Sequence, residues 1–80
     1  MKADNRRDVA IAFAKVLRTA RNNKGLTQEE LAELADLDRT YPSLLERAKR
    51  TPTLGTLINI AIALDVTPDR MVSDTLADMK

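Results

Sequence analysis

Apolar residues recur every three or four positions along most of this chain, which is the spacing of one face of an α-helix. The first such stripe consists of Val9, Phe13, Val16, Leu17 and Ala20. It predicts a helix from about residue 5 to residue 24, with Asp4 or Asn5 as its N-cap, because short polar side chains favour that position. Gly25 follows as the stop at the C-terminal end.

The second predicted helix opens on a capping box, in which the side chains of Thr27 and Glu30 satisfy backbone N–H groups of the first turn. Its apolar face is expected to consist of Leu31, Leu34 and Ala35. The helix should end near Ala35, and residues 36–38 should then form a tight polar turn around one buried side chain, Leu37.

A third helix is predicted from Asp38, or from Thr40, to about Ala48. Two short helices joined by so short a turn cross steeply, so residues 27–48 have the pattern of a helix-turn-helix. In this arrangement the second helix protrudes and can enter the major groove of DNA, while the first helix crosses the backbone. The angle between the two helices is expected to be filled by Leu31, Ala35, Leu37 and Leu45.

Two further helices are predicted in the last part of the chain. Thr53 caps a helix from residue 54 to residue 64, and Pro68, after Thr67, opens a fifth helix that runs to about Asp78. The chain is therefore expected to form a single all-α domain over residues 1–80, with five helices and a central helix-turn-helix.

The fourth and fifth predicted helices carry more apolar side chains than one small core needs. The surplus residues recur at helical spacing: Ile58, Ile62, Val72, Leu76 and Met79. Exposed apolar surface of this kind marks an interface, which predicts a two-fold homodimer through the fifth helix, at about residues 68–78, and part of the fourth. The alternative is that these side chains close the core of the monomer.

The formal net charge of +1 hides two basic segments. Residues 1–25 carry seven Lys or Arg against two Asp, and residues 39–50 carry four Lys or Arg against one Glu. A polyanion responds to the local field of such segments and not to the total charge, although clustered cations can also simply solvate a surface.

Composition excludes several classes of function. The chain has no Cys and no His, so it can form neither a disulfide nor a thiolate or imidazole metal site, and it lacks the residues that most often serve as nucleophile and base. We therefore expect no enzyme activity, no cofactor and no metal. No apolar run resembles a signal peptide or a membrane span, so a cytoplasmic protein with no membrane partner is expected.

Three segments of the chain resemble one known family. Residues 25–32 read GLTQEELA and are similar to the first half of the helix-turn-helix of the lambda-repressor/Cro type, also called the XRE family. Residues 38–41 (DRTY) and 45–47 (LER) resemble its recognition helix, and residues 54–66 resemble its fourth helix and exit. The likeness covers about residues 13–72, and the Arg-Thr-Tyr start is most similar to the controller proteins of restriction–modification systems.

The resemblance implies roles for named residues. Base contacts are expected from Arg39, Thr40, Tyr41, Ser43 and Leu44. Phosphate contacts are expected from Thr27, Gln28, Arg47, Lys49 and Arg50. Arg21 and Glu46 match a family pair that forms a partly buried salt bridge. The alternatives are solvation or a phosphate contact for Arg39, local capping for Thr40, a phosphate bond or packing for Tyr41, and packing for Leu44. For Ser43, Gln28, Arg47, Lys49 and Arg50 the alternative is plain solvation.

Three positions depart from the family pattern. Asp36 and Ala48 replace the glycines that usually lie in the turn and at the end of the recognition helix. Asp tolerates a left-handed backbone better than most residues, whereas Ala weakens the predicted stop. Pro42 replaces a branched apolar residue and has no N–H, which suits only the first turn of a helix.

Taken together, these features predict a sequence-specific transcriptional regulator that binds a (pseudo)palindromic operator in double-stranded DNA as a homodimer. No small-molecule effector is expected. The alternative is a protein-interaction module, such as an antitoxin or an adaptor, that binds a protein partner through its helical surface.

Overall fold

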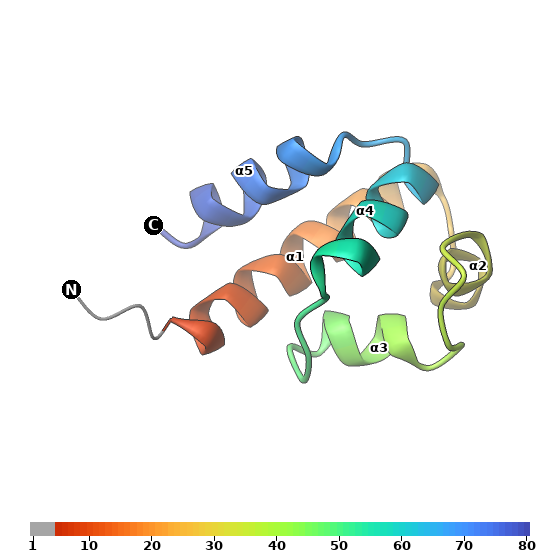
Figure 1. Ribbon diagram of the computed structural model, residues 1–80, viewed down its shortest axis with the longest axis horizontal. Helices are drawn as coiled ribbons and strands as arrows, with labels where there is room; N and C mark the ends of the chain where they lie inside the picture. Colours follow the sequence, from red (N-terminus) through yellow and green to blue (C-terminus); the bar gives the residue numbers. More distant parts are fainter. Residues whose placement is uncertain (1–4) are drawn as a thin grey trace.

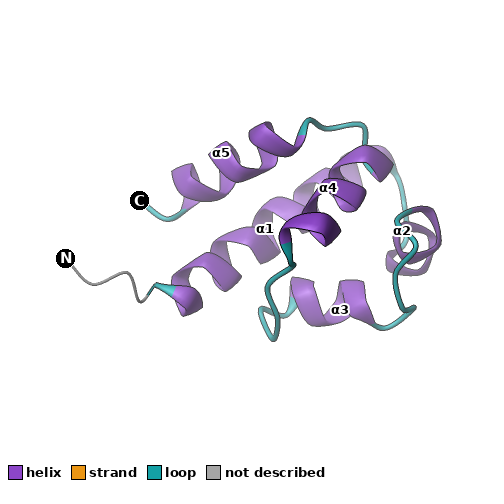
Figure 2. Cartoon of the chain, viewed as in Figure 1, coloured by secondary structure: helices purple, strands orange, loops and turns teal. Residues whose placement is uncertain are grey.

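The computed structural model describes residues 5–80, and within this range the regular structure is entirely helical (Figure 2). The helices are α1 (Arg6–Lys24), α2 (Gln28–Leu34), α3 (Tyr41–Glu46), α4 (Leu54–Ala63) and α5 (Pro68–Asp78). The predicted all-α fold with five helices is thus confirmed. None of these helices combines the length and the apolar character that crossing a bilayer requires.

The long helix α1 runs through the middle of the molecule, with α5 packed along one side of it and α3 along the other (Figure 1). α2 packs against α3 and α4, and α4 also packs against α5. All five helices contribute to the core, whose fully buried apolar side chains include Leu17, Leu31, Leu45, Ile60 and Met71. The packing leaves the outer face of α3, with Ser43 and Leu44, only partly covered.

The ends of α1 differ in how closely they follow the sequence pattern. Asp4, one of the two predicted caps, lies outside the described residues. Asn5 is the N-cap residue, which confirms the predicted position, but its side chain makes no capping hydrogen bond. Gly25 ends the helix with φ +75°, a left-handed backbone that costs glycine little because it has no Cβ.

In α2 the predicted capping box is present. The Glu30 N–H donates to Thr27 Oγ1 over 3.0 Å, and the Thr27 N–H donates to Glu30 Oε1 over 2.9 Å. Leu31 and Ala35 are buried as expected, but Leu34 is 60% exposed, which corrects its placement on the apolar face. The buried face is completed by Ala32 instead, and the helical period places Leu34 roughly 100° from the centre of that face.

The helix α3 begins at the later of the two predicted positions. Thr40 is the N-cap residue, and Asp38 lies outside the helix, where its Oδ1 accepts hydrogen bonds from the Thr40 hydroxyl at 2.7 Å and the Thr40 N–H at 2.9 Å. These two bonds hold the pKa of the Asp38 carboxyl below its usual value. Pro42 is buried in the first turn, where a missing N–H breaks no helical bond.

The helix α3 ends two residues earlier than predicted, and Ala48 lies just beyond it in the left-handed region, with φ +57°. Asp36, in the turn, has φ +57° as well. Both residues therefore adopt the backbone that the family glycines would adopt. The left-handed turn at Ala48 lets the Lys49 N–H donate to the Leu44 carbonyl over 2.9 Å, which closes the end of the helix.

Replacing Ala48 with glycine is expected to raise the free energy of unfolding by about 0.5–1 kcal/mol. The Cβ of an L residue in this region costs roughly 1–2 kcal/mol, and part of the gain is offset by the greater freedom of glycine in the unfolded chain. Urea denaturation measures the change. The control is Ala77→Gly at an exposed helical position in α5, which should lower the free energy of unfolding. Equal destabilisation by both substitutions would contradict the strain at Ala48.

Candidate nucleic-acid interface

The inner end of α3 is fixed by a buried carboxylate. The Glu46 side chain has no exposed surface, and Arg21 of α1 donates to it through two bonds, Nε to Oε2 at 2.6 Å and Nη2 to Oε1 at 2.9 Å. The structure thus brings together the two residues that the family resemblance paired. Because a fork of two parallel bonds fixes both groups, this contact holds α3 at a defined angle to α1.

Two further donors reach the same carboxylate, and neither role was predicted. Arg18 Nε lies 3.3 Å from Glu46 Oε1 and its Nη2 donates to the Glu46 carbonyl at 3.2 Å. Gln28 Nε2 donates to Oε1 over 3.2 Å. The spacing of Arg18 and Arg21 on one helical face was the available signal for the first contact. We call Glu46, Arg18, Arg21 and Gln28 the Glu46 network.

The Glu46 network keeps its carboxylate ionised despite burial. Burial by itself raises the pKa of Glu46, but the hydrogen bonds from Arg21, Gln28 and Arg18 and the charge of Arg21 together lower it below the usual value. The same hydrogen bond to Glu46 raises the pKa of Arg21 against the effect of its own burial. The network therefore holds charged groups at the base of α3 at neutral pH.

A shallow hollow lies between the start of α2 and the outer face of α3, and we call it the recognition hollow. Seven of the ten residues predicted to contact DNA line it. The complete lining is Arg21, Thr27, Gln28, Glu29, Arg39, Thr40, Ser43, Leu44 and Arg47. Residues chosen separately for phosphate and base contact are thus gathered on one surface.

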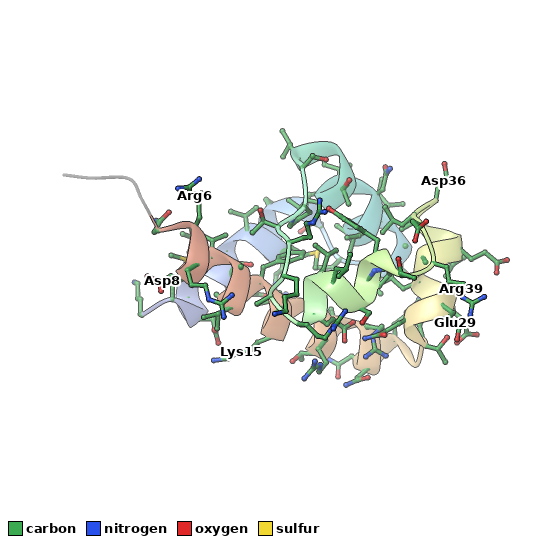
Figure 3. The ribbon with its side chains drawn as sticks, turned by 90° about the horizontal axis from the view of Figure 1, so that it is seen from below. Arg6, Asp8, Lys15, Glu29, Asp36 and Arg39 are labelled. Carbon is green, nitrogen blue, oxygen red and sulfur yellow. The ribbon has the colours of Figure 1, made fainter. Side chains whose placement is uncertain are left out.

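Arg39 lies at the outer edge of the recognition hollow, and its side chain is 81% exposed. Its Nε is 3.6 Å from Glu29 Oε2, and both side chains lie at the same end of the molecule (Figure 3). The Thr40 hydroxyl donates to Asp38 Oδ1. Thr40 is the N-cap residue of α3, but its side chain makes no capping hydrogen bond, so the capping role that was the alternative to base contact is absent. Ser43 and Leu44 are half-buried in the hollow, where their outer surfaces remain accessible.

The remaining predicted contact residues lie outside the recognition hollow. Tyr41 is half-buried and packs against the hydrophobic core, which was the alternative to a base contact. Lys49 and Arg50 are exposed in the segment that follows α3. Gln28, by contrast, lines the recognition hollow, and its amide nitrogen, predicted to bind phosphate, donates to Glu46.

The predicted interface residues on α4 and α5 remain largely uncovered in the single chain. The exposed fractions are 37% for Ile58, 68% for Ile62, 45% for Val72 and 57% for Leu76, whereas Met79 is half-buried. Leu54, which precedes Ile58 by one helical turn, is 72% exposed and was missed although it continues the same stripe. The alternative, in which these side chains close the monomer core, is therefore wrong for the four exposed residues.

Comparison with known proteins places this geometry in a family. Residues 17–71, more than half of the 80-residue chain, match the family described as Helix-turn-helix. Control protein C.SmaI of Serratia marcescens is 39% identical over 66 residues, which are 82% of this chain and 79% of that protein. The restriction-modification controller protein C.AhdI of Aeromonas hydrophila has a crystal structure that aligns with a TM-score of 0.74 and 40% identity, over 78% of this chain and 94% of that one.

A second solved structure extends the likeness beyond the controller proteins. The clp gene regulator ClgR of Corynebacterium glutamicum aligns with a TM-score of 0.83 and 28% identity, over 89% of this chain and 76% of that chain. Relatives of this kind are regulators and not enzymes, which agrees with the absence of enzyme activity expected from the sequence. The chain belongs to the lambda-repressor/Cro-type (XRE) family of helix-turn-helix transcriptional regulators.

Proposed function

We propose that this chain regulates transcription by binding a (pseudo)palindromic operator in double-stranded DNA as a homodimer. The observation that carries the proposal is the recognition hollow, which gathers Arg39, Ser43 and Leu44 of the recognition segment beside Thr27 and Arg47. Recognition helices of this family lie in the major groove, where such side chains meet base edges and the flanking phosphates. By likeness to C.SmaI and C.AhdI, we propose a controller role of the same kind.

The proposal divides the surface into two kinds of contact. Arg39 is assigned to a guanine, because an exposed guanidinium at the tip of α3 can donate two bonds to that base. Thr40, Ser43 and Leu44, which line the hollow, are assigned to neighbouring bases. Tyr41 is assigned to a base only through the part of its side chain that the core leaves accessible. Phosphates are assigned to Thr27, Gln28, Arg47, Lys49 and Arg50. For Gln28, the bond to Glu46 fixes the side chain and leaves its second amide hydrogen for a phosphate.

The homodimer is proposed from the exposed apolar stripes of α4 and α5. Three large apolar side chains on α4 and two on α5 are more than a third exposed: Leu54, Ile58, Ile62, Val72 and Leu76. Surface of this kind is stabilised when a second copy covers it, and identical chains pair through the same patch around a two-fold axis. A two-fold dimer of this family spaces its recognition helices about 34 Å apart, one turn of DNA.

Two substitutions that each remove one positive charge should have different effects on DNA binding. Arg39→Ala is expected to lower the preference for the operator over other DNA by about 5- to 150-fold, the range that one bidentate base contact provides. Lys49→Ala is expected to weaken binding to all DNA equally and to lower the slope of log K against log salt by about 1. The measurement is fluorescence anisotropy at two salt concentrations, with an operator selected from random DNA.

The outcomes separate the two roles. Uniform loss of affinity in both variants would show that the division into base and phosphate contacts is wrong. Failure of the wild-type chain to select any DNA sequence would contradict the proposed function itself.

A further inference from the structure

The first quarter of the chain is strongly basic, and the recognition hollow does not account for this charge. Four of its cations face carboxylates elsewhere in the fold, at distances between 2.6 and 3.7 Å: Lys15, Arg18, Arg21 and Lys24. These ion pairs link α1 to α3, to α5 and to the turn that follows α4. Their charges are therefore largely committed to the fold itself.

Arg7 is different, because its partner is a neutral group. Its Nη1 donates to the Ala48 carbonyl over 3.1 Å, and the side chain is exposed. A carbonyl orients a guanidinium but does not cancel its charge, and four of the five N–H donors of an arginine remain after one bond. The left-handed turn at Ala48 places this carbonyl against the first turn of α1. The guanidinium is thus held in place while its charge still faces solvent.

The same contact gathers a cluster of cations from two distant parts of the sequence. Arg6 and Arg7 of α1 line one shallow hollow together with Lys49 and Arg50, and we call it the basic hollow. All four side chains belong to exposed residues. In the view onto α3, Arg6 and the start of α1 lie beyond one end of that helix, whereas Arg39 lies beyond the other (Figure 3). The two hollows therefore flank the recognition helix.

We propose that the basic hollow binds a phosphodiester group of the DNA backbone, with Arg7 as its central ligand. The proposal rests on the proposed function and adds α1 to the DNA-binding surface. A helix lying in the major groove has phosphates on both sides, and the recognition hollow supplies donors for only one of them. Guanidinium groups match the geometry of phosphate oxygens, and the bond to Ala48 reduces the entropy lost on binding.

The test removes the charge of Arg7. Arg7→Gln keeps a polar side chain, but its amide nitrogen ends two bonds short of the Arg7 Nη1, so the bond to the Ala48 carbonyl is lost together with the charge. It is expected to weaken binding to operator and to unrelated DNA alike, roughly five- to ten-fold at about 0.1 M salt, and to lower the slope of log K against log salt by about 0.9. Arg7→Lys, which keeps the charge, should retain the wild-type slope.

Two controls make the result decisive. Arg70→Gln removes one cation from α5, on the far side of α1 from α3, and should leave the slope unchanged. Arg50→Gln removes another cation of the basic hollow, leaves the bond between Arg7 and Ala48 intact and should lower the slope as well, even if Arg7→Gln fails to fold. If the wild-type chain binds DNA but both variants keep its slope, the basic hollow is a structural tie only and the inference is overturned. If the wild-type chain binds no DNA, the proposed function fails as well.

Discussion

Arg21→Met is expected to lower the free energy of unfolding by about 3 kcal/mol, the low end of the range for breaking a buried ion pair. The Glu46 carboxylate is completely buried and the Arg21 side chain is 14% exposed, so the substitution removes two short bonds from a charge that water cannot reach. Arg18 and Gln28 remain, which is why the loss should not reach the upper end of that range. Urea denaturation measures the change.

The controls separate the buried pair from ordinary surface charge. Lys24→Met breaks an exposed pair with Asp65 and should change the free energy of unfolding by less than about 1 kcal/mol. Adding Glu46→Leu to Arg21→Met removes the stranded carboxylate and should recover much of the loss. If Arg21→Met costs no more than Lys24→Met, the Glu46 network does not stabilise the fold.

The dependence of stability on pH provides a second measurement on the same variant. The folded pKa of Glu46 is lowered, so its contribution is fully present above the unfolded pKa, about 4.3, and is lost as the pH falls through the folded value. The hydrogen bond from Arg21 is the largest effect that lowers the pKa of Glu46 against the effect of burial. In Arg21→Met the pKa of Glu46 should therefore rise, and the stability that is lost in acid should be lost at a higher pH than in the wild type. Asp38, whose pKa is also lowered, titrates in both proteins and does not affect the comparison.

Local signals in the sequence were sufficient for most helix boundaries. Thr27 and Thr53 accept hydrogen bonds from the N–H groups at their third helical positions, and Pro68 is the first residue of α5. Such caps act within one turn, so the chain itself shows them. The start of α3 was ambiguous because Asp38 and Thr40 are both good caps. The structure resolves the choice through the hydrogen bonds between these two residues.

The parts that sequence reasoning missed depend on distant residues. Arg18 and Gln28 contact Glu46 from α1 and α2, across 28 and 18 positions of sequence. A pattern of neighbouring residues cannot show that side chains so far apart in the sequence are in contact. The basic hollow likewise joins Arg7 to Ala48 over 41 positions. The prediction that Leu34 is buried was wrong for a different reason. A helix of seven residues buries only a narrow face, and apolar periodicity does not locate so narrow a face.

Leu76→Asp is expected to convert the dimer into monomers and to lower operator affinity by about 100-fold or more. The Leu76 side chain is 57% exposed in the single chain and belongs to the stripe with Val72, so a partner must cover it in the proposed dimer. A carboxylate there would be buried without a counter-ion, which strongly disfavours association. Two linked recognition helices gain their affinity by binding together, and separate monomers lose that gain.

The matched control introduces the same charge elsewhere on the same helix. Ala77 is also exposed but lies one residue further round α5, beside the groove that faces α1. Ala77→Asp should therefore leave both the dimer and operator affinity close to wild type, as measured by analytical ultracentrifugation and anisotropy. Circular dichroism should show both variants folded, because neither side chain is part of the core. A Leu76→Asp protein that still sediments as a wild-type dimer would remove α5 from the interface, and the proposed spacing of the recognition helices would then lose its structural basis.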